Sequence, residues 1–304
     1  MNSPGHSILR TVSVAAARRL SMLLLTVAAS ALVSGALVRM APGFGTDDRQ
    51  LDLRLSEESI AVVRSQTGSP LVARSSFTTS VTGLRDYVSD LAKGDWGFSV
   101  SLGRPVRELV ADRAGLTLRT LGAGLALAWG LSFGLSLMLE GLHRHALELA
   151  AMLVAGGLLC LPAAIVAMVF LYLDLGPALA LALVLSPRIF RYVRNILAAS
   201  SRRPHVLAAR GRGSGGVSLL WRQVTIPAAP ELLALTGISA SMAIGAVIPV
   251  ETLCGSPGVG QLVWLSAMAR DLPVLVHLTV LVAVATSGAN LFSDVARAVV
   301  VRGL

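Results

Sequence analysis

Long apolar runs separated by short charged segments dominate the chain. A helix needs about 20 mostly apolar residues to cross the hydrocarbon core of a membrane. Five runs reach or approach that length, and only one of them, through Arg119 near its start, contains a charged residue: Leu20–Val38, Leu116–Leu139, Leu149–Leu173, Leu232–Val250 and Pro273–Phe292. Each run therefore predicts a transmembrane helix, and Pro162 in the third predicts a kink.

A further crossing is expected between the third and fifth of these helices, although its apolar stretch is short. Gly176–Pro187 is apolar, and Arg188, Arg191 and Arg194 then follow at a spacing of three. We expect a helix from about Ala178 to Leu197 whose last third leaves the hydrocarbon, with the arginines facing lipid headgroups or protein. The pattern thus predicts an all-α membrane protein with six transmembrane helices.

The distribution of arginine predicts the orientation. Residues 1–19 contain Arg10, Arg18 and Arg19 and no acid, and the segment from Arg188 to Arg222 is rich in arginine and again without an acid. Positive charge marks cytoplasmic segments, so residues 1–19, residues 200–230 and the C-terminus are predicted to be cytoplasmic. A cleaved signal peptide is the alternative for residues 20–38, but the length of the apolar run favours a retained span.

Residues 39–115 differ in kind from the rest of the chain. Basic and acidic residues alternate there in equal number, and residues 68–80 are rich in Ser and Thr. Long loops cross membranes largely regardless of charge, so this segment is predicted to be an external, periplasmic loop. Val106–Arg119 has apolar residues near helical spacing and is expected to be an amphipathic lead-in to the five-helix core of residues 116–304.

Composition supports a membrane protein. The 304 residues are 54% hydrophobic and 14% charged, with a net charge of +9 and a mean hydropathy of +0.71, whereas soluble domains carry about 25% charged residues. The basic excess lies between apolar runs, where orientation explains it without a nucleic-acid partner. We expect a multi-pass membrane protein, with the lipid bilayer as a partner and no nucleic acid.

Motifs for catalysis are missing from the sequence. The only lysine, Lys93, is not part of a phosphate-binding GxxxxGK[ST] loop, and HExxH and GxSxG are also absent. Cys160 and Cys254 form no CxxC pair, and the five histidines have no metal-ligand spacing. The sequence therefore predicts no catalytic residue, metal or cofactor, and a membrane subunit driven from the cytoplasm by a separate protein.

Several motifs, in order along the chain, resemble one family of permeases. They are Gly94–Ser99, Gly103–Val106, Ala208–Gly213, Pro230, Gly237, Gly245–Thr252, Ser256–Gly260, Ala269–Pro273, and Asn290 with Asp294. This series is similar to the permease subunits of bacterial ABC importers for dipeptides and oligopeptides, of the type with a long external loop. Two departures from the family pattern are Leu207, in place of an acid, and the Gly215-Gly216 pair.

The resemblance implies the type I permease fold of ABC importers, a second homologous permease, two ATP-binding subunits and an extracytoplasmic solute-binding protein. It implies that residues 207–217 couple the chain to the ATPases, through Leu207, Ala208, Ala209, Arg210, Gly211, Arg212, Gly213 and Pro230. It also suggests an external gate at the pathway mouth formed by Glu251, Pro257, Gly258, Gly260, Arg270 and Asp271.

Other interpretations of the chain and of its candidate residues stay open. A stand-alone secondary transporter or channel would need the midplane acids that the sequence lacks, and a degenerate, non-transporting scaffold is the third possibility. Glu251 could equally be an interfacial residue satisfied by water or by an arginine, and the arginines of 202–212 could serve membrane orientation alone.

Overall fold

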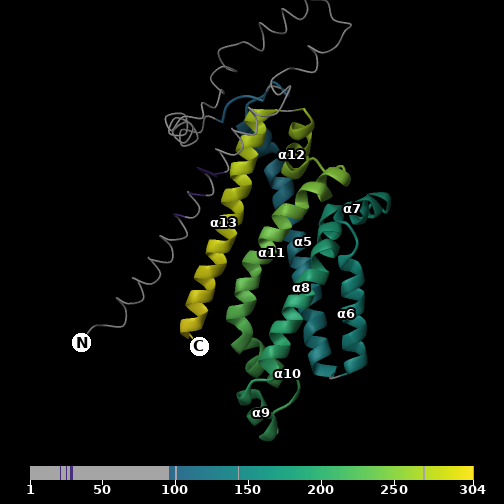
Figure 1. The fold of residues 1–304 in the computed structure, drawn as a ribbon, viewed down its shortest axis with the longest axis vertical. Helices are drawn as coiled ribbons and strands as arrows, with labels where there is room; N and C mark the ends of the chain where they lie inside the picture. Colours follow the sequence, from purple (N-terminus) through teal and green to yellow (C-terminus); the bar gives the residue numbers. More distant parts are fainter. Residues whose placement is uncertain are drawn as a thin grey trace, which may run out of the picture. The chain divides into compact units, whose positions relative to one another are not determined.

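The computed structural model describes residues 96–99, 101–142, 144–269 and 271–303, with four further positions between residues 21 and 29. All but four residues of the expected first span, most of the external loop, and Arg270 therefore lie outside the described residues. The long elements of the described part are all helices (Figure 1): α5 Val106–Leu142, α6 His145–Leu159, α7 Ala163–Tyr172, α8 Pro177–Ser201, α9 Pro204–Gly211, α10 Gly216–Leu219, the π-helix η2 Leu220–Thr225, α11 Ile226–Leu253, α12 Val259–Met268 and α13 Leu272–Gly303.

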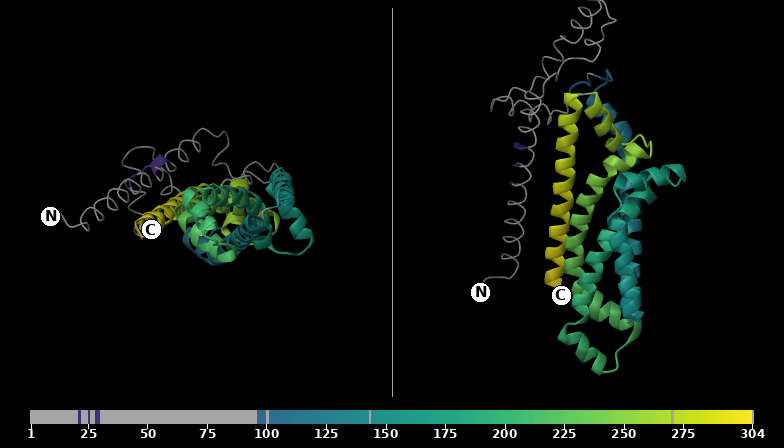
Figure 2. Two further views of the ribbon diagram at one scale, coloured as in Figure 1. Left: turned by 90° about the horizontal axis from the view of Figure 1, so that it is seen from below. Right: turned by 45° about the vertical axis from the view of Figure 1, so that its right-hand side comes forward.

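The chain divides into two compact units. The first contains residues 116–260 and 286–304, and the second contains residues 20–115 and 261–285; residues 1–19 are assigned to the first. In the first unit, α8 packs against α6, α7 and α11, and α9 and α10 lie at the end where α8 finishes and α11 begins (Figures 1 and 2).

The core of the first unit is built on one face of α8. Leu181, Leu185, Ile189, Val193 and Leu197 recur every four residues, and all are at most 3% exposed. Side chains four apart share a helix face, so this row forms a continuous apolar ridge. Alanines and leucines of α11 and partly buried side chains of α5 pack against the same cluster.

Glycine allows α5 and α8 to approach closely. A Cβ atom on Gly124 would lie 2.9 Å from Leu181 Cδ2 and 3.0 Å from the Ala178 carbonyl oxygen. A methyl group has no room there, because the second contact is to backbone. A similar approach occurs between α11 and α13, where a Cβ on Gly237 would lie 2.8 Å from Ser293 Cβ.

The expected third span, Leu149–Leu173, is not one helix. It is divided into α6 and α7, which are bent by 91° at the break around Leu161. Pro162 stands at the N-cap of α7, and proline lacks the N–H that would continue the hydrogen bonding of α6. Gly156 and Gly157 further weaken the preceding turn. The expected kink is therefore a full break.

Other expected helices are present with different bounds. The amphipathic lead-in and the second span form the single helix α5, and the short arginine-bearing segment forms α8. Three helices of the described part are long and apolar enough to cross a membrane, or four if the bent pair counts as one span. The described residues thus define a multi-helix membrane protein, and the six-span arrangement stays an expectation.

The second unit holds a tight hairpin-like turn before α5. Phe98 and Pro105 form an isolated antiparallel bridge, and the Ser99 N–H donates to the Arg104 carbonyl at 2.9 Å. Gly97 and Gly103 have positive φ values of 66° and 62°, a conformation that side chains disfavour.

Candidate functional site

A buried arginine links three helices at the end of the first unit that carries α9. Arg194 on α8 donates from Nη1 to Glu140 Oε2 of α5 at 2.6 Å, and its Nη2 lies 2.7 Å from Glu148 Oε1 of α6. The Arg194 and Glu140 side chains are each 7% exposed. A buried charge requires such pairing, so Arg194 faces protein, one of the two settings expected from the sequence.

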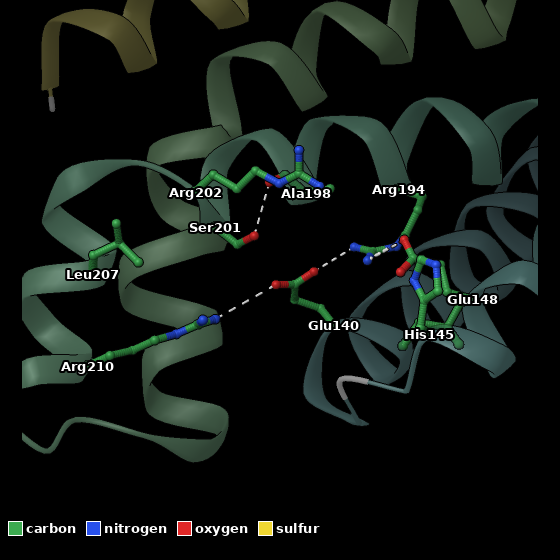
Figure 3. A pocket seen from close by; sticks show the side chains of 10 residues that line it. Glu140, His145, Glu148, Arg194, Ala198, Ser201, Arg202, Leu207 and Arg210 are labelled. Atoms are coloured by element: carbon green, nitrogen blue, oxygen red, sulfur yellow. Dashed lines mark hydrogen bonds and ion pairs between the residues drawn. The ribbon is translucent and has the colours of Figure 1, made fainter.

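The network extends to α9. Arg210 Nη2 lies 3.9 Å from Glu140 Oε1, the second oxygen of the carboxylate that binds Arg194 (Figure 3). These residues line a cavity of about 370 Å³ between α5, α6, α8 and α9, together with His145, Ser201, Arg202 and Leu207. One carboxylate therefore bridges a helix of the core and the short helix α9.

The other side of α9 is attached to the start of α11. Arg203, which precedes α9, forms an ion pair with Glu231 at 3.1 Å. Its Nη1 also donates to the Pro227 carbonyl oxygen at 3.3 Å. Both contacts are partly exposed, so each is worth little in stability, and they connect the start of α9 with the first turns of α11.

Two further contacts reach the π-helix η2. His205 Nε2 lies 3.0 Å from the Gln223 carbonyl oxygen, and Ser200 Oγ donates to the Val224 carbonyl at 2.8 Å. In an α-helix the N–H of residue 227 would donate to the Gln223 carbonyl, but Pro227 has no N–H. The His205 ring contacts this carbonyl instead.

The α9 helix has one buried face and one exposed face. Val206 and Ala209 are 0% and 1% exposed and belong to the core, whereas Leu207 is 57% exposed and Ala208, Gly211 and Arg212 are also exposed. Of the residues selected from the sequence, Ala209 thus faces the protein, and Pro230 lies inside α11.

Gly213 ends α9 by a specific turn. Its φ is +83°, its N–H donates to the Arg210 carbonyl at 3.0 Å, and the Ser214 N–H donates to the Ala209 carbonyl at 3.1 Å. This pair of bonds is the Schellman arrangement, which favours glycine at the left-handed position. The glycine selected from the sequence therefore has a direct structural role.

A second buried cluster lies at the other end of α11. Glu251 is 0% exposed, and its Oε2 accepts hydrogen bonds from Thr117 Oγ1 at 3.1 Å and from the Gly260 N–H at 2.8 Å. Thr117 Oγ1 in turn accepts from the Val259 N–H at 2.7 Å. Glu251 is therefore buried and hydrogen-bonded to protein groups rather than exposed to water.

The two glycines selected with Glu251 leave space for it. A Cβ on Gly258 would overlap the Glu251 carboxylate, and one on Gly260 would lie 2.9 Å from both Ile248 Cα and the Val247 carbonyl oxygen. Glu251, Gly258 and Gly260 are thus brought together, whereas Pro257 beside them is exposed. Thr117, which holds the cluster together, was not selected because an isolated threonine in an apolar run gives no signal.

Asp271 belongs to a separate cluster in the second unit. It is 1% exposed, and its Oδ2 accepts from Ser99 Oγ at 2.5 Å, Ser101 Oγ at 2.7 Å and the Ser101 N–H at 3.0 Å. The predicted external gate therefore comprises one cluster in each unit. Among the described residues, no group of three or more His, Cys, Asp or Glu side chains could hold a metal ion.

The protein has apolar helices that are long enough to cross a membrane, and a short polar helix is linked to them at one end. These features define an integral membrane component. Residues 130–304 match the family described as "Binding-protein-dependent transport system inner membrane component". The chain belongs to this family. The match confirms the permease family that was predicted from its motifs. It is a transmembrane permease of the ABC importer class, a membrane component of a transporter.

Named relatives agree with the family. A Brucella ovis protein named as a peptide permease is 27% identical over 124 residues, 41% of this chain and 39% of the relative, so the match spans less than half of that relative. A Brucella suis protein, also named as a peptide permease, is 25% identical over 243 residues, 70% of this chain and 76% of the relative. A nickel import system permease of Staphylococcus aureus is 33% identical over 99 residues, 33% of this chain and 30% of the relative.

Proposed function

We propose that the protein imports peptides across the bacterial cytoplasmic membrane as one of two permease subunits. An extracytoplasmic solute-binding protein delivers the peptide, and two ATP-binding subunits drive transport. The Brucella relatives named as peptide permeases support the peptide class. In this arrangement six spans place both termini and α9 in the cytoplasm, with residues 39–115 in the periplasm, as the arginine distribution favours.

The attachment of α9 to two long helices is the observation that carries the proposal. Arg210 ties α9 to Glu140 of α5, and Arg203 ties it to Glu231 of α11. A force applied to α9 therefore reaches both helices together. We infer that its exposed face, with Leu207 and Ala208, docks on an ATPase subunit, while Val206 and Ala209 anchor it to the core.

The Glu251 cluster suits the role of an outer gate. It joins the end of α11, α5 through Thr117 and the start of α12 through Val259 and Gly260. The 28 residues of α11 extend about 42 Å at 1.5 Å per residue, so a rigid movement of α11 at the α9 end is carried to this cluster. Asp271 and Ser99 make the corresponding proposed gate contact in the second unit.

An Ala208→Glu substitution tests the coupling role. Ala208 is exposed, so the change alters the docking face without disturbing the core, unlike any change at buried Ala209. The expected result in the reconstituted complex is loss of ATP-driven peptide uptake and weaker co-purification of the ATPase subunits. The matched control is Ala146→Glu, an exposed site in the first turn of α6, where an acid suits the helix dipole.

The outcomes separate the proposal from its alternatives. Uptake that is unchanged in Ala208→Glu would contradict coupling through α9. Uptake that continues when the ATPase subunits are omitted would instead indicate a stand-alone transporter. Wild-type vesicles that take up no peptide, with all partner subunits present, would indicate a different solute or a non-transporting scaffold.

A further inference from the structure

A second cavity of the first unit contains a single charged side chain. Its volume is about 320 Å³, and it lies between the α6–α7 break, α8 and α11. The residues that line it are apolar apart from Arg188 of α8, and they include Leu161 and Met242. Cavities of this size accommodate small solutes, and a few polar groups in an apolar lining fix their orientation.

The cavity lies beside the middle of two long helices. Arg188 is close to the centre of the 25-residue helix α8, and Met242 is close to the centre of the 28-residue helix α11. Leu161 stands at the break between α6 and α7. The cavity is therefore bordered by the middle parts of α8 and α11 and by the α6–α7 break.

Arg188 is an exposed residue that lines this cavity, whereas Arg194 is buried. Arg194 is bound by two carboxylates, whereas Arg188 forms no ion pair or hydrogen bond with any residue in the described part of the chain. An arginine in a membrane-spanning helix is costly unless it faces protein or a water-filled cavity, and it typically marks a solute or ion pathway. Non-helical backbone within a membrane, such as the α6–α7 break would provide, likewise belongs beside protein or a water-filled cavity.

We propose that Arg188 and this cavity form a binding site for the carboxylate of the transported solute. The inference rests on the proposed peptide import, since every unmodified peptide ends in a carboxylate. Guanidinium binds carboxylate through two parallel hydrogen bonds, a geometry that suits recognition of a terminal carboxylate. The apolar remainder of the cavity then contacts the adjoining side chains of the solute.

Uptake of trialanine and its C-terminal amide by the reconstituted complex tests the site. Amidation removes the terminal charge. We expect Arg188→Gln to lower the ratio of trialanine to amide uptake by about tenfold, the loss of a charged hydrogen bond. Arg188→Lys is expected to restore part of the ratio. The control is Arg191→Gln, which removes an exposed arginine outside the cavity and should leave the ratio unchanged.

The binding protein's own preference for trialanine over its amide is the same in the wild-type and the Arg188→Gln complex. It therefore cancels when the two uptake ratios are compared, and the difference reports on Arg188. An unchanged ratio in Arg188→Gln would overturn the site. Equal loss of uptake for both tripeptides would also overturn it, since Arg188 would then bind a carboxylate of the partner permease rather than that of the solute.

A labelling experiment on the same complex is independent of peptide transport. Met242→Cys, with Cys160 and Cys254 replaced by alanine, is treated with an anionic sulfonatoethyl thiosulfonate and with a neutral methyl thiosulfonate. We expect the labelling rate of the anionic reagent, divided by that of the neutral reagent, to fall in Arg188→Gln. Equal relative rates with and without Arg188, or no labelling by either reagent, would contradict an anion site even if peptides are not the solute. If the wild-type complex takes up no tripeptide but the labelling rates change as expected, the proposal of peptide import is contradicted and the anion site is not.

Discussion

Arg194 and Glu140 form a buried ion pair of 2.6 Å between α8 and α5, with each side chain 7% exposed. Glu148 is a second partner of the same guanidinium but is 33% exposed. Because Glu140 also faces Arg210, this pair sits where the core meets α9. Its integrity therefore matters for both folding and the proposed coupling.

Arg194→Met is predicted to lower the free energy of unfolding by about 3–5 kcal/mol, because it leaves the buried Glu140 carboxylate without its main partner. The double variant Arg194→Met/Glu140→Met should recover most of this loss, since it removes both charges. Denaturant unfolding in detergent measures both effects. A single variant as stable as the wild type would show that the pair is not buried in the protein.

Thr117→Val is predicted to destabilise the protein by about 1–3 kcal/mol. The change keeps the shape but removes the hydroxyl that donates to Glu251 and accepts from Val259, and unsatisfied buried polar groups carry that cost. Thr117→Ser keeps the hydroxyl and is the control. Thermal unfolding of the two variants compares them, and equal midpoints would contradict the contact.

Gly260→Ala is predicted to lower the free energy of unfolding by about 1–3 kcal/mol, because the added methyl group overpacks the site. The added methyl would meet Ile248 Cα and the Val247 carbonyl, which are backbone atoms and cannot turn aside. Gly130→Ala is the control, because nothing lies within 4 Å of its added Cβ and alanine favours a helix. Slower uptake by Gly260→Ala than by Gly130→Ala would support the role of this junction as a gate.

Asp271→Ala is predicted to loosen the turn that precedes α5. It removes the acceptor of two serine hydroxyls and of the Ser101 N–H. Hydrogen exchange of residues 98–105 should become faster, while exchange at Ala198–Ser201 of α8 serves as an internal control. If the Ser101 N–H exchanges as slowly in Asp271→Ala as in the wild type, the hydrogen bond to Asp271 is contradicted.

The helices themselves could be predicted from hydrophobic runs because burial in a membrane imposes a length and an apolar composition on each helix. The α8 helix was found despite its three arginines, since the topology required a helix there. The break at Pro162 was underestimated, because sequence shows where an N–H is missing but not whether neighbouring helices restore a straight path.

The side-chain partners could not be predicted in the same way. Glu140 and Arg194 are 54 residues apart, and Thr117 and Glu251 are 134 apart, so only the tertiary arrangement brings them together. Motif similarity selected Gly213 for coupling and Gly258 and Gly260 for the gate. The structure shows a left-handed backbone at the first and little room for a side chain at the other two, and it shows that Ala209 is buried among exposed residues of α9.

The π-helix at Leu220–Thr225 has a mechanical consequence. Its hydrogen bonds close over one residue more than those of an α-helix, so this turn is wider than the α-helical turns of α11 that follow it. His205 and Ser200 hold α9 and α8 to carbonyls within that turn. A displacement of α9 therefore reaches the start of α11 through this widened turn rather than through a regular α-helical one.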